Sequence, residues 1–217
     1  MSSDSERLID GLVADLDPVD PLPRARVGLA GIAIVWAGVA AWSLQGLDHA
    51  PGVANLGQEP LYGLALLGLA AAGFAGAGAA ILGTRPGRET EQRPAAGLAL
   101  VVFGAAVVAC AVGFLGSERA MASSSGIDGA CFQRSFLLSV LPGLAIGRSI
   151  LAGWPGQPLV AGALAIGAAG ALGALAVHLV CDLATADHLL TAHLSVPLVA
   201  AAVGCLPAGF LLARLRG

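Results

Sequence analysis

The chain has 217 residues, of which 57% are hydrophobic, 12% are charged and 31 are glycines. Soluble domains carry about 25% charged residues, whereas the mean hydropathy of +0.83 is typical of a chain that lies mostly in lipid. The composition argues against a soluble enzyme, a nucleic-acid-binding domain and a disordered chain. The net charge of −3 is too small to indicate a polyanionic partner, so we expect no direct binding of nucleic acid.

Six continuous apolar runs follow a polar segment of 26 residues. A helix needs about 20 apolar residues to cross about 30 Å of hydrocarbon, and continuous runs lack the alternation of a membrane strand. We therefore expect an all-α protein with a tail over residues 1–26 and a six-helix transmembrane bundle over residues 27–217. The expected helices are Val27–Leu47, Leu61–Gly83, Pro94–Gly116, Cys131–Gly153, Pro158–Cys181 and Leu189–Ala213.

The placement of arginine predicts how this bundle is oriented. Short cytoplasmic loops of membrane proteins are enriched in basic residues. With the N-terminus inside, nine arginines lie on the cytoplasmic side, and only Arg119 and Arg134 lie on the other. Both termini are therefore predicted to be cytoplasmic. The nine are Arg7, Arg24, Arg26, Arg85, Arg88, Arg93, Arg148, Arg214 and Arg216.

Glycines recur along two of the expected helices. Small residues let membrane helices approach closely, either within one bundle or between two copies. Because glycine is abundant throughout the chain, we expect packing within one bundle, and the oligomeric state is not predicted. The residues are Gly143, Gly147, Gly162, Gly167, Gly170 and Gly173.

The polar tail contains an amphipathic helix. Ser3 and Glu6 have the spacing of a capping box. A helix of about 13 residues is marginal alone in water, so its apolar face needs a partner. The polar face is acidic, which argues against a membrane surface. The chain's own loops are one candidate, and a soluble protein with an apolar groove and a basic rim is the other. The stripe consists of Leu8, Ile9, Leu12, Val13 and Leu16, with Asp10, Asp15 and Asp17 outside it.

The predicted topology brings two cysteines and three histidines to the outer face. Cys131 begins the fourth helix there, and Cys181 ends the fifth, three residues after His178. His188 and His193 lie in the first turns of the sixth helix. Thiolate and imidazole bind zinc and other soft or borderline metals, whereas two cysteines in an oxidising compartment can form a disulfide. A third interpretation is that the cysteines are small apolar residues of membrane helices.

Two other cysteines and one arginine need separate interpretations. Cys110 and Cys205 lie within expected helices and fit the role of small apolar residues. Arg134 is costly in lipid unless it reaches the interface or pairs with an acid. Asp128 and Asp182 are the candidate partners.

Two parts of the sequence carry distinctive motifs. The tail has Leu8-Ile9-x-x-Leu12-x-x-Asp15-Leu16-x-Pro18-Val19-x-Pro21. The second half has Cys131-Phe132-Gln133-Arg134, Leu141-Pro142-Gly143, Gly147-Arg148, Pro158, Ala161-Gly162, His178, Cys181, His193 and Pro197. In these motifs the chain resembles the family of negative regulators of sigma F. The resemblance covers the tail and about residues 131–200, whereas residues 30–125 match only in helix count.

The resemblance implies an anti-sigma factor of the bacterial cytoplasmic membrane that has no enzymatic activity. It implies that Cys131 and Cys181 sense metal or oxidative stress. We expect either a disulfide between them or a site for zinc or another soft metal, with His178 and His193 as further ligands. The resemblance also implies that the tail holds an extracytoplasmic-function (ECF) sigma factor away from RNA polymerase. The expected contact residues are Leu8, Ile9, Leu12, Val13, Asp15 and Leu16.

The alternative function is a small-solute or ion transporter or channel. Such a protein would carry ionisable residues near the middle of the membrane, whereas the charges of this chain lie at the ends of the expected helices. A membrane enzyme is a weaker alternative, because the sequence has no GxSxG, no HExxH and no intramembrane pair of carboxylates.

Overall fold

The structure is a computed structural model that describes residues 3–14, 22–45, 51–116 and 129–214. Within these ranges all regular structure is helical, and six helices are long and apolar enough to cross a membrane. The predicted fold class and helix count are therefore confirmed. The six are Ala25–Ser43, Pro60–Leu82, Thr90–Leu115, Gly129–Leu151, Pro158–His178 and Ala186–Arg214.

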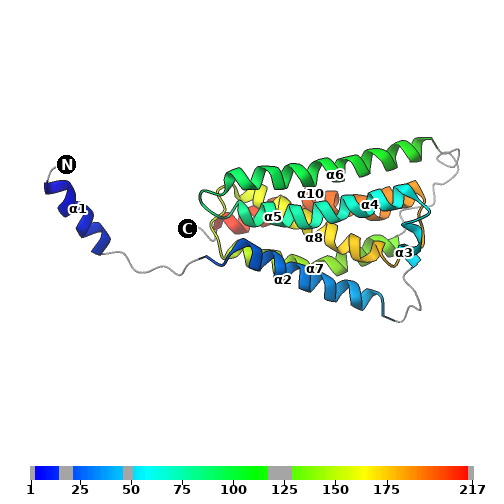
Figure 1. Ribbon diagram of the computed structural model, residues 1–217, viewed down its shortest axis with the longest axis horizontal. Coiled ribbons are helices and arrows are strands. Elements are labelled where there is room, and N and C mark those ends of the chain that lie inside the picture. The colour runs from blue at the N-terminus through cyan, green and yellow to red at the C-terminus, as the bar shows by residue number, and fades with distance from the viewer. Residues whose placement is uncertain (1–2, 15–21, 46–50, 117–128, 215–217) are drawn as a thin grey trace.

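The helices run alongside one another in one elongated bundle, with α1 outside it (Figure 1). The start of α2 and the end of α10 lie at one end, here called the near end, and α7 begins at the opposite, far end. The elements are α1 (Ser3–Ala14), α2 (Ala25–Ser43), α3 (Pro51–Asn55), α4 (Pro60–Ala70), the π-helix η1 (Ala71–Ala75), α5 (Gly76–Leu82), α6 (Glu89–Leu115), α7 (Gly129–Leu151), α8 (Pro158–His178), α9 (Ala186–His188), the π-helix η3 (Leu189–Leu194) and α10 (Ser195–Arg214).

Helix α8 is the centre of the bundle, packed mainly between α10 and α7. Its glycines allow this packing. A Cβ at Gly162 would lie 3.0 Å from the backbone nitrogen of Gly209, and one at Gly170 would lie 3.2 Å from Cα of Pro197. A Cβ at Gly173 would lie 2.7 Å from the backbone nitrogen of Ser139 on α7. Gly162, Gly170 and Gly173 therefore pack within one bundle, as the sequence predicts.

Two of the six spans are interrupted by a π-helical turn. In such a turn each hydrogen bond reaches one residue further than in an α-helix, and π-turns are frequent at functional sites. One of them, η1, lies against α8, because a Cβ at Gly73 would come within 2.6 Å of Cδ2 of Leu172. The indole of Trp36 on α2 donates a hydrogen bond of 3.0 Å to the carbonyl of the same Leu172.

Several helix ends differ from their predicted positions. Helix α6 begins at Glu89, five residues before Pro94, where the apolar run predicts the third span to begin. The earlier turn is polar, and there Arg88 forms an ion pair of 2.5 Å with Glu91. Helix α8 ends at His178, which leaves Cys181 in the connection to α9.

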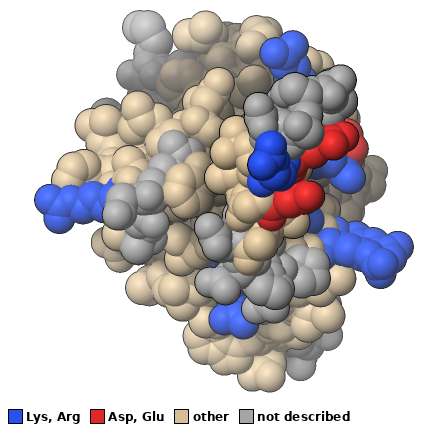
Figure 2. Space-filling model, turned by 90° about the vertical axis from the view of Figure 1, so that its left-hand side faces the viewer, with Lys and Arg blue, Asp and Glu red and all other residues tan. Residues whose placement is uncertain are grey.

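Large apolar side chains cover the outside of the bundle. Examples from α2, α6, α7 and α10 are Ile34 (72% exposed), Val101 (71%), Leu144 (66%) and Val203 (72%). An apolar surface this extensive needs a partner, since soluble proteins rarely expose more than a few hundred Å² in one patch. The near end is different in kind, with basic side chains spread around its rim (Figure 2).

Candidate metal and thiol site

Four potential metal ligands converge at the far end of the bundle. Cys131 lies in the first turn of α7, and Cys181 lies in the connection between α8 and α9. His188 ends α9, and His193 lies in η3. Their ligand atoms all lie within 4.8 Å of one another. Cys181, His188 and His193 are buried and Cys131 is half-buried, so the group is largely shielded from solvent.

Three of the six distances between ligand atoms in this group are close to those of a tetrahedral site. With Zn–S bonds near 2.3 Å and Zn–N bonds near 2.0–2.1 Å, the ligand atoms of a tetrahedron lie about 3.8 Å apart for two sulfurs, about 3.5 Å for sulfur and nitrogen and about 3.3 Å for two nitrogens. The two Sγ atoms are 4.0 Å apart. Sγ of Cys181 lies 3.2 Å from Nε2 of His188, and the two Nε2 atoms of His188 and His193 are also 3.2 Å apart. The donors therefore fit a Cys₂His₂ metal site.

The π-turn explains how the two histidines meet. In an α-helix each residue turns by about 100°, so His188 and His193, five residues apart, would point to different sides. In a π-turn residues i and i+5 come close together. Because η3 spans Leu189–Leu194, both imidazoles face the cysteines.

A second layer of side chains fixes the segment that carries Cys181. The hydroxyl of Tyr62 donates to the carbonyl of His178 and lies 3.2 Å from the carbonyl of Cys181. From α3, the side-chain amide of Asn55 donates to the carbonyl of Asp182 at 3.1 Å. Cys181 is thus held in place by the second span and by α3, although it lies outside any helix. Such outer-layer partners orient ligands in metal sites.

His178 lies beside the four-residue group. Its ring stacks on Tyr62 at 3.9 Å between centroids, and its Nε2 lies 3.1 Å from the carbonyl oxygen of Tyr62. It meets the ring of His193 edge-to-face at 5.0 Å. The sequence-derived ligand set named His178 and His193, whereas the structure brings His188 and His193 together with the cysteines. The sequence feature that indicates His188 as a further candidate ligand is its position in the same expected helix as His193.

Burial affects the chemistry of these groups. Among the described residues, the buried Nδ1 atoms of His178 and His193 have no hydrogen-bond partner. Desolvation by burial raises the pKa of the Cys181 thiol to about 12. The thiol is therefore protonated at neutral pH and releases its proton when it binds a metal.

The thiols of Cys131 and Cys181 are not joined in a disulfide. Their Sγ atoms are 4.0 Å apart, about twice the length of a disulfide bond. Cys110 and Cys205 are also free thiols and lie in α6 and α10, apart from the site. No ion pair joins Arg134 to Asp182, both of which the structure describes, and the alternative partner Asp128 lies outside the described residues.

The tail helix α1 ends at Ala14. Its apolar side chains are exposed, with 65% exposure for Leu8 and 61% for Leu12. Ile9 and Val13 are also exposed. The predicted contact residues Asp15 and Leu16, and Asp17 beside them, lie outside the described residues.

The chain matches the family model described as "Negative regulator of sigma F" over residues 12–213. It belongs to this family. The match includes the six apolar helices and all four residues of the far-end group, and it begins within the predicted tail helix. No match was found among curated proteins or among solved structures. Membership of this family implies that the chain negatively regulates a sigma factor.

Proposed function

We propose that this chain is an anti-sigma factor of the bacterial cytoplasmic membrane that holds an ECF sigma factor through its tail. A metal or an oxidant at the far-end group then releases the sigma factor. The observation that carries the sensing half is the convergence of four ligand atoms within 4.8 Å. Family membership carries the sigma-factor half.

The membrane location is supported by the surface of the bundle. Apolar side chains of α2, α6, α7 and α10 are exposed along their lengths, and water would not tolerate such a surface on a monomer. The basic near end matches the side on which cytoplasmic loops carry arginine. In this orientation both termini are cytoplasmic, and the metal and thiol site faces the periplasm.

The tail is proposed to bind the sigma factor by its apolar stripe. Leu8, Ile9, Leu12 and Val13 are exposed on one face of α1. An amphipathic helix that docks into a groove buries such a face. The acidic residues Asp10, Asp15 and Asp17 would contact basic residues of the sigma factor that otherwise neutralise DNA phosphates.

Metal and oxidant would act differently on the far end. A metal would keep the two Sγ atoms near their present separation of 4.0 Å, at about 3.8 Å. A disulfide would shorten that separation to about 2.05 Å and draw the first turn of α7 towards the α8–α9 connection. Either state biases the position of α7, and coupling to the tail requires that the bundle has two packings.

A pull-down from source-cell membranes tests the sigma-factor half. The full-length chain is expected to recover a sigma factor, and a variant lacking residues 2–21 is expected to recover none. Leu12→Asp puts a charge on the apolar stripe and should reduce recovery at least tenfold. Ala14→Asp is the matched control, because it adds the same charge on the opposite side of α1. Recovery of no sigma factor with any variant would refute the anti-sigma function, and uptake in liposomes would then test transport.

A further inference from the structure

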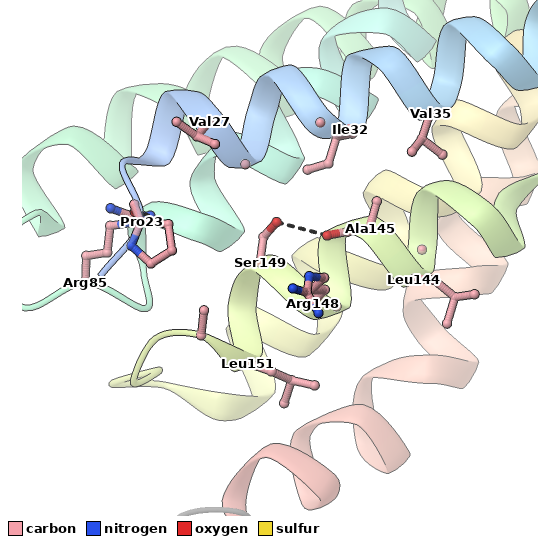
Figure 3. A pocket seen from close by; sticks show the side chains of 15 residues that line it. Pro23, Val27, Ile32, Val35, Arg85, Leu144, Ala145, Arg148, Ser149 and Leu151 are labelled. Carbon is pink, nitrogen blue, oxygen red and sulfur yellow. Dashed lines mark hydrogen bonds between the residues drawn. The ribbon is translucent and has the colours of Figure 1, made fainter. Parts of the chain in front are cut away.

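A cavity of about 940 Å³ lies between the near-end halves of α2 and α7. Its walls are apolar: Val27, Ile32 and Val35 line it from α2, and Leu144 and Leu151 line it from α7 (Figure 3). Val27 is 59% exposed and Leu144 is 66% exposed. The space is therefore an open groove on the side of the bundle, and not an internal void.

The near end of this groove is basic. Arg148 projects from the last turn of α7 and is exposed. No acidic side chain among the described residues forms an ion pair with it. Arg85 follows α5, and its guanidinium donates to the carbonyl of Pro23. Nε of Arg85 is buried, and it has no hydrogen-bond partner among the described residues. The groove thus has two guanidinium groups that can bind an anion. Among the described residues, that of Arg148 has no carboxylate partner, and that of Arg85 has a buried N–H without an acceptor.

Glycines keep the groove open. A Cβ added at Gly31 or at Gly147 would meet no heavy atom within 4 Å, although both residues line the cavity. Gly28 differs, because a Cβ there would lie 3.1 Å from Oγ of Ser149. Close contact between α2 and α7 therefore requires a glycine at Gly28 only. At the other two glycines the free space lies in the groove.

We propose that this groove binds one anionic phospholipid, with its phosphate at Arg148 and Arg85 and an acyl chain along α2. The proposal rests on the membrane location proposed above. Val27 and Val35 are eight residues apart, which corresponds to about 12 Å along a helix, so the apolar wall extends well beyond a headgroup. Arginine pairs with phosphate in bidentate geometry, and basic pockets between transmembrane helices bind anionic headgroups.

Charge and depth favour a lipid over the chain's own tail. Helix α1 carries the acids Asp4, Glu6 and Asp10. Docking α1 into a groove that faces hydrocarbon would bring these carboxylates towards lipid, which is costly. A lipid brings a charged group to the basic end and only hydrocarbon to the apolar walls. The occupant would then lie between the helix that follows the tail and the helix that carries Cys131.

Native mass spectrometry of the detergent-purified full-length chain tests the proposal. Dioleoyl phosphatidylglycerol is added as the probe, and dioleoyl phosphatidylcholine is the zwitterionic comparison. We expect one phosphatidylglycerol per chain, with occupancy at least tenfold higher than for phosphatidylcholine. Arg148→Gln should lower this occupancy at least tenfold, and Arg214→Gln, on α10 away from the groove, should leave it unchanged. Both side chains are exposed, so neither variant should disturb folding.

Filling the groove provides an independent test. Gly31→Leu should abolish phosphatidylglycerol binding because its side chain enters the cavity. Gly38→Leu is the matched control, since Gly38 lies on the same helix, has nothing within 4 Å of its Cβ and does not line the cavity.

Three results would overturn the lipid proposal. The first is unchanged phosphatidylglycerol binding in both Arg148→Gln and Gly31→Leu. The second is lipid binding only after deletion of residues 2–21, which would mean that the tail occupies the groove. The third is a dimer that only Gly31→Leu disrupts, which would mean that a second copy of the chain occupies it. Membrane fractionation of the wild-type chain tests the membrane location independently of the lipid site. A chain found in the membrane without groove-specific lipid refutes the lipid site alone.

Discussion

Replacing His188 by alanine should remove one of the four proposed metal ligands and sharply weaken zinc binding. Three of the six distances between ligand atoms, 4.0, 3.2 and 3.2 Å, differ from the edges of a zinc tetrahedron by at most about 0.3 Å, and all six are within 4.8 Å. The wild-type site therefore needs little rearrangement to bind the metal. Loss of an outer-layer partner in a metal site costs 10–100-fold in affinity, so loss of a direct ligand should cost at least about 100-fold, or about 2.7 kcal/mol.

His178→Phe is the informative comparison for this experiment. Phenylalanine keeps an aromatic ring that can stack on Tyr62 but has no nitrogen. Because His178 lies beside the four-residue group, its replacement should weaken zinc binding less than tenfold. Affinities can be measured by competition with a chromophoric chelator on detergent-purified protein. Wild-type affinity in His188→Ala, together with a large loss in His178→Phe, would refute the assignment of His188 as a ligand.

Three further predictions concern the cysteines and the packing of α8. Serine at Cys131 or at Cys181 should abolish the response of a sigma-factor-dependent reporter to both metal and oxidant, whereas Cys205→Ser should respond like the wild type. Zinc-loaded protein should form the disulfide at least tenfold more slowly than metal-free protein under a mild oxidant, as followed by thiol labelling, because the metal holds both sulfurs. Gly173→Ala should lower the free energy of unfolding by about 1–3 kcal/mol through overpacking, measured by thermal unfolding, whereas Gly104→Ala should not, since its Cβ meets nothing within 4 Å.

The sequence predicted the six helices because their signal is local. Each span is a long apolar run with few charges, and the backbone of such a run must satisfy its hydrogen bonds internally. Helix ends were less well predicted. The apolar run predicts a third span from about Pro94, whereas α6 includes a polar turn before it, and hydropathy alone does not report a polar helical turn.

The ligand set was only partly predicted, for a geometric reason. A regular α-helical period separates residues i and i+5, so it gives no reason to pair His188 with His193. The π-turn at Leu189–Leu194 brings them together, and hydropathy does not reveal such a turn. His178 was favoured because it lies one turn before Cys181 along the chain. In the structure, α8 ends at His178, and Cys181 turns towards α7 and η3 instead.

The two ends of the bundle are connected by the same helix. Helix α7 carries Cys131 in its first turn and Arg148 in its last, so a shift of its far end must be taken up within α7 or passed to its near end. The near end of α7 faces α2 across the groove. Helix α2 also contacts α8, where the indole of Trp36 donates a hydrogen bond to the carbonyl of Leu172. Trp36 lies more than two helical turns after Val27, which lines the near end of the groove. The near-end part of α2 contacts α7 directly, because a Cβ at Gly28 would lie 3.1 Å from Oγ of Ser149. In the proposed mechanism this is where a displacement of α7 would reach the helix that follows the tail.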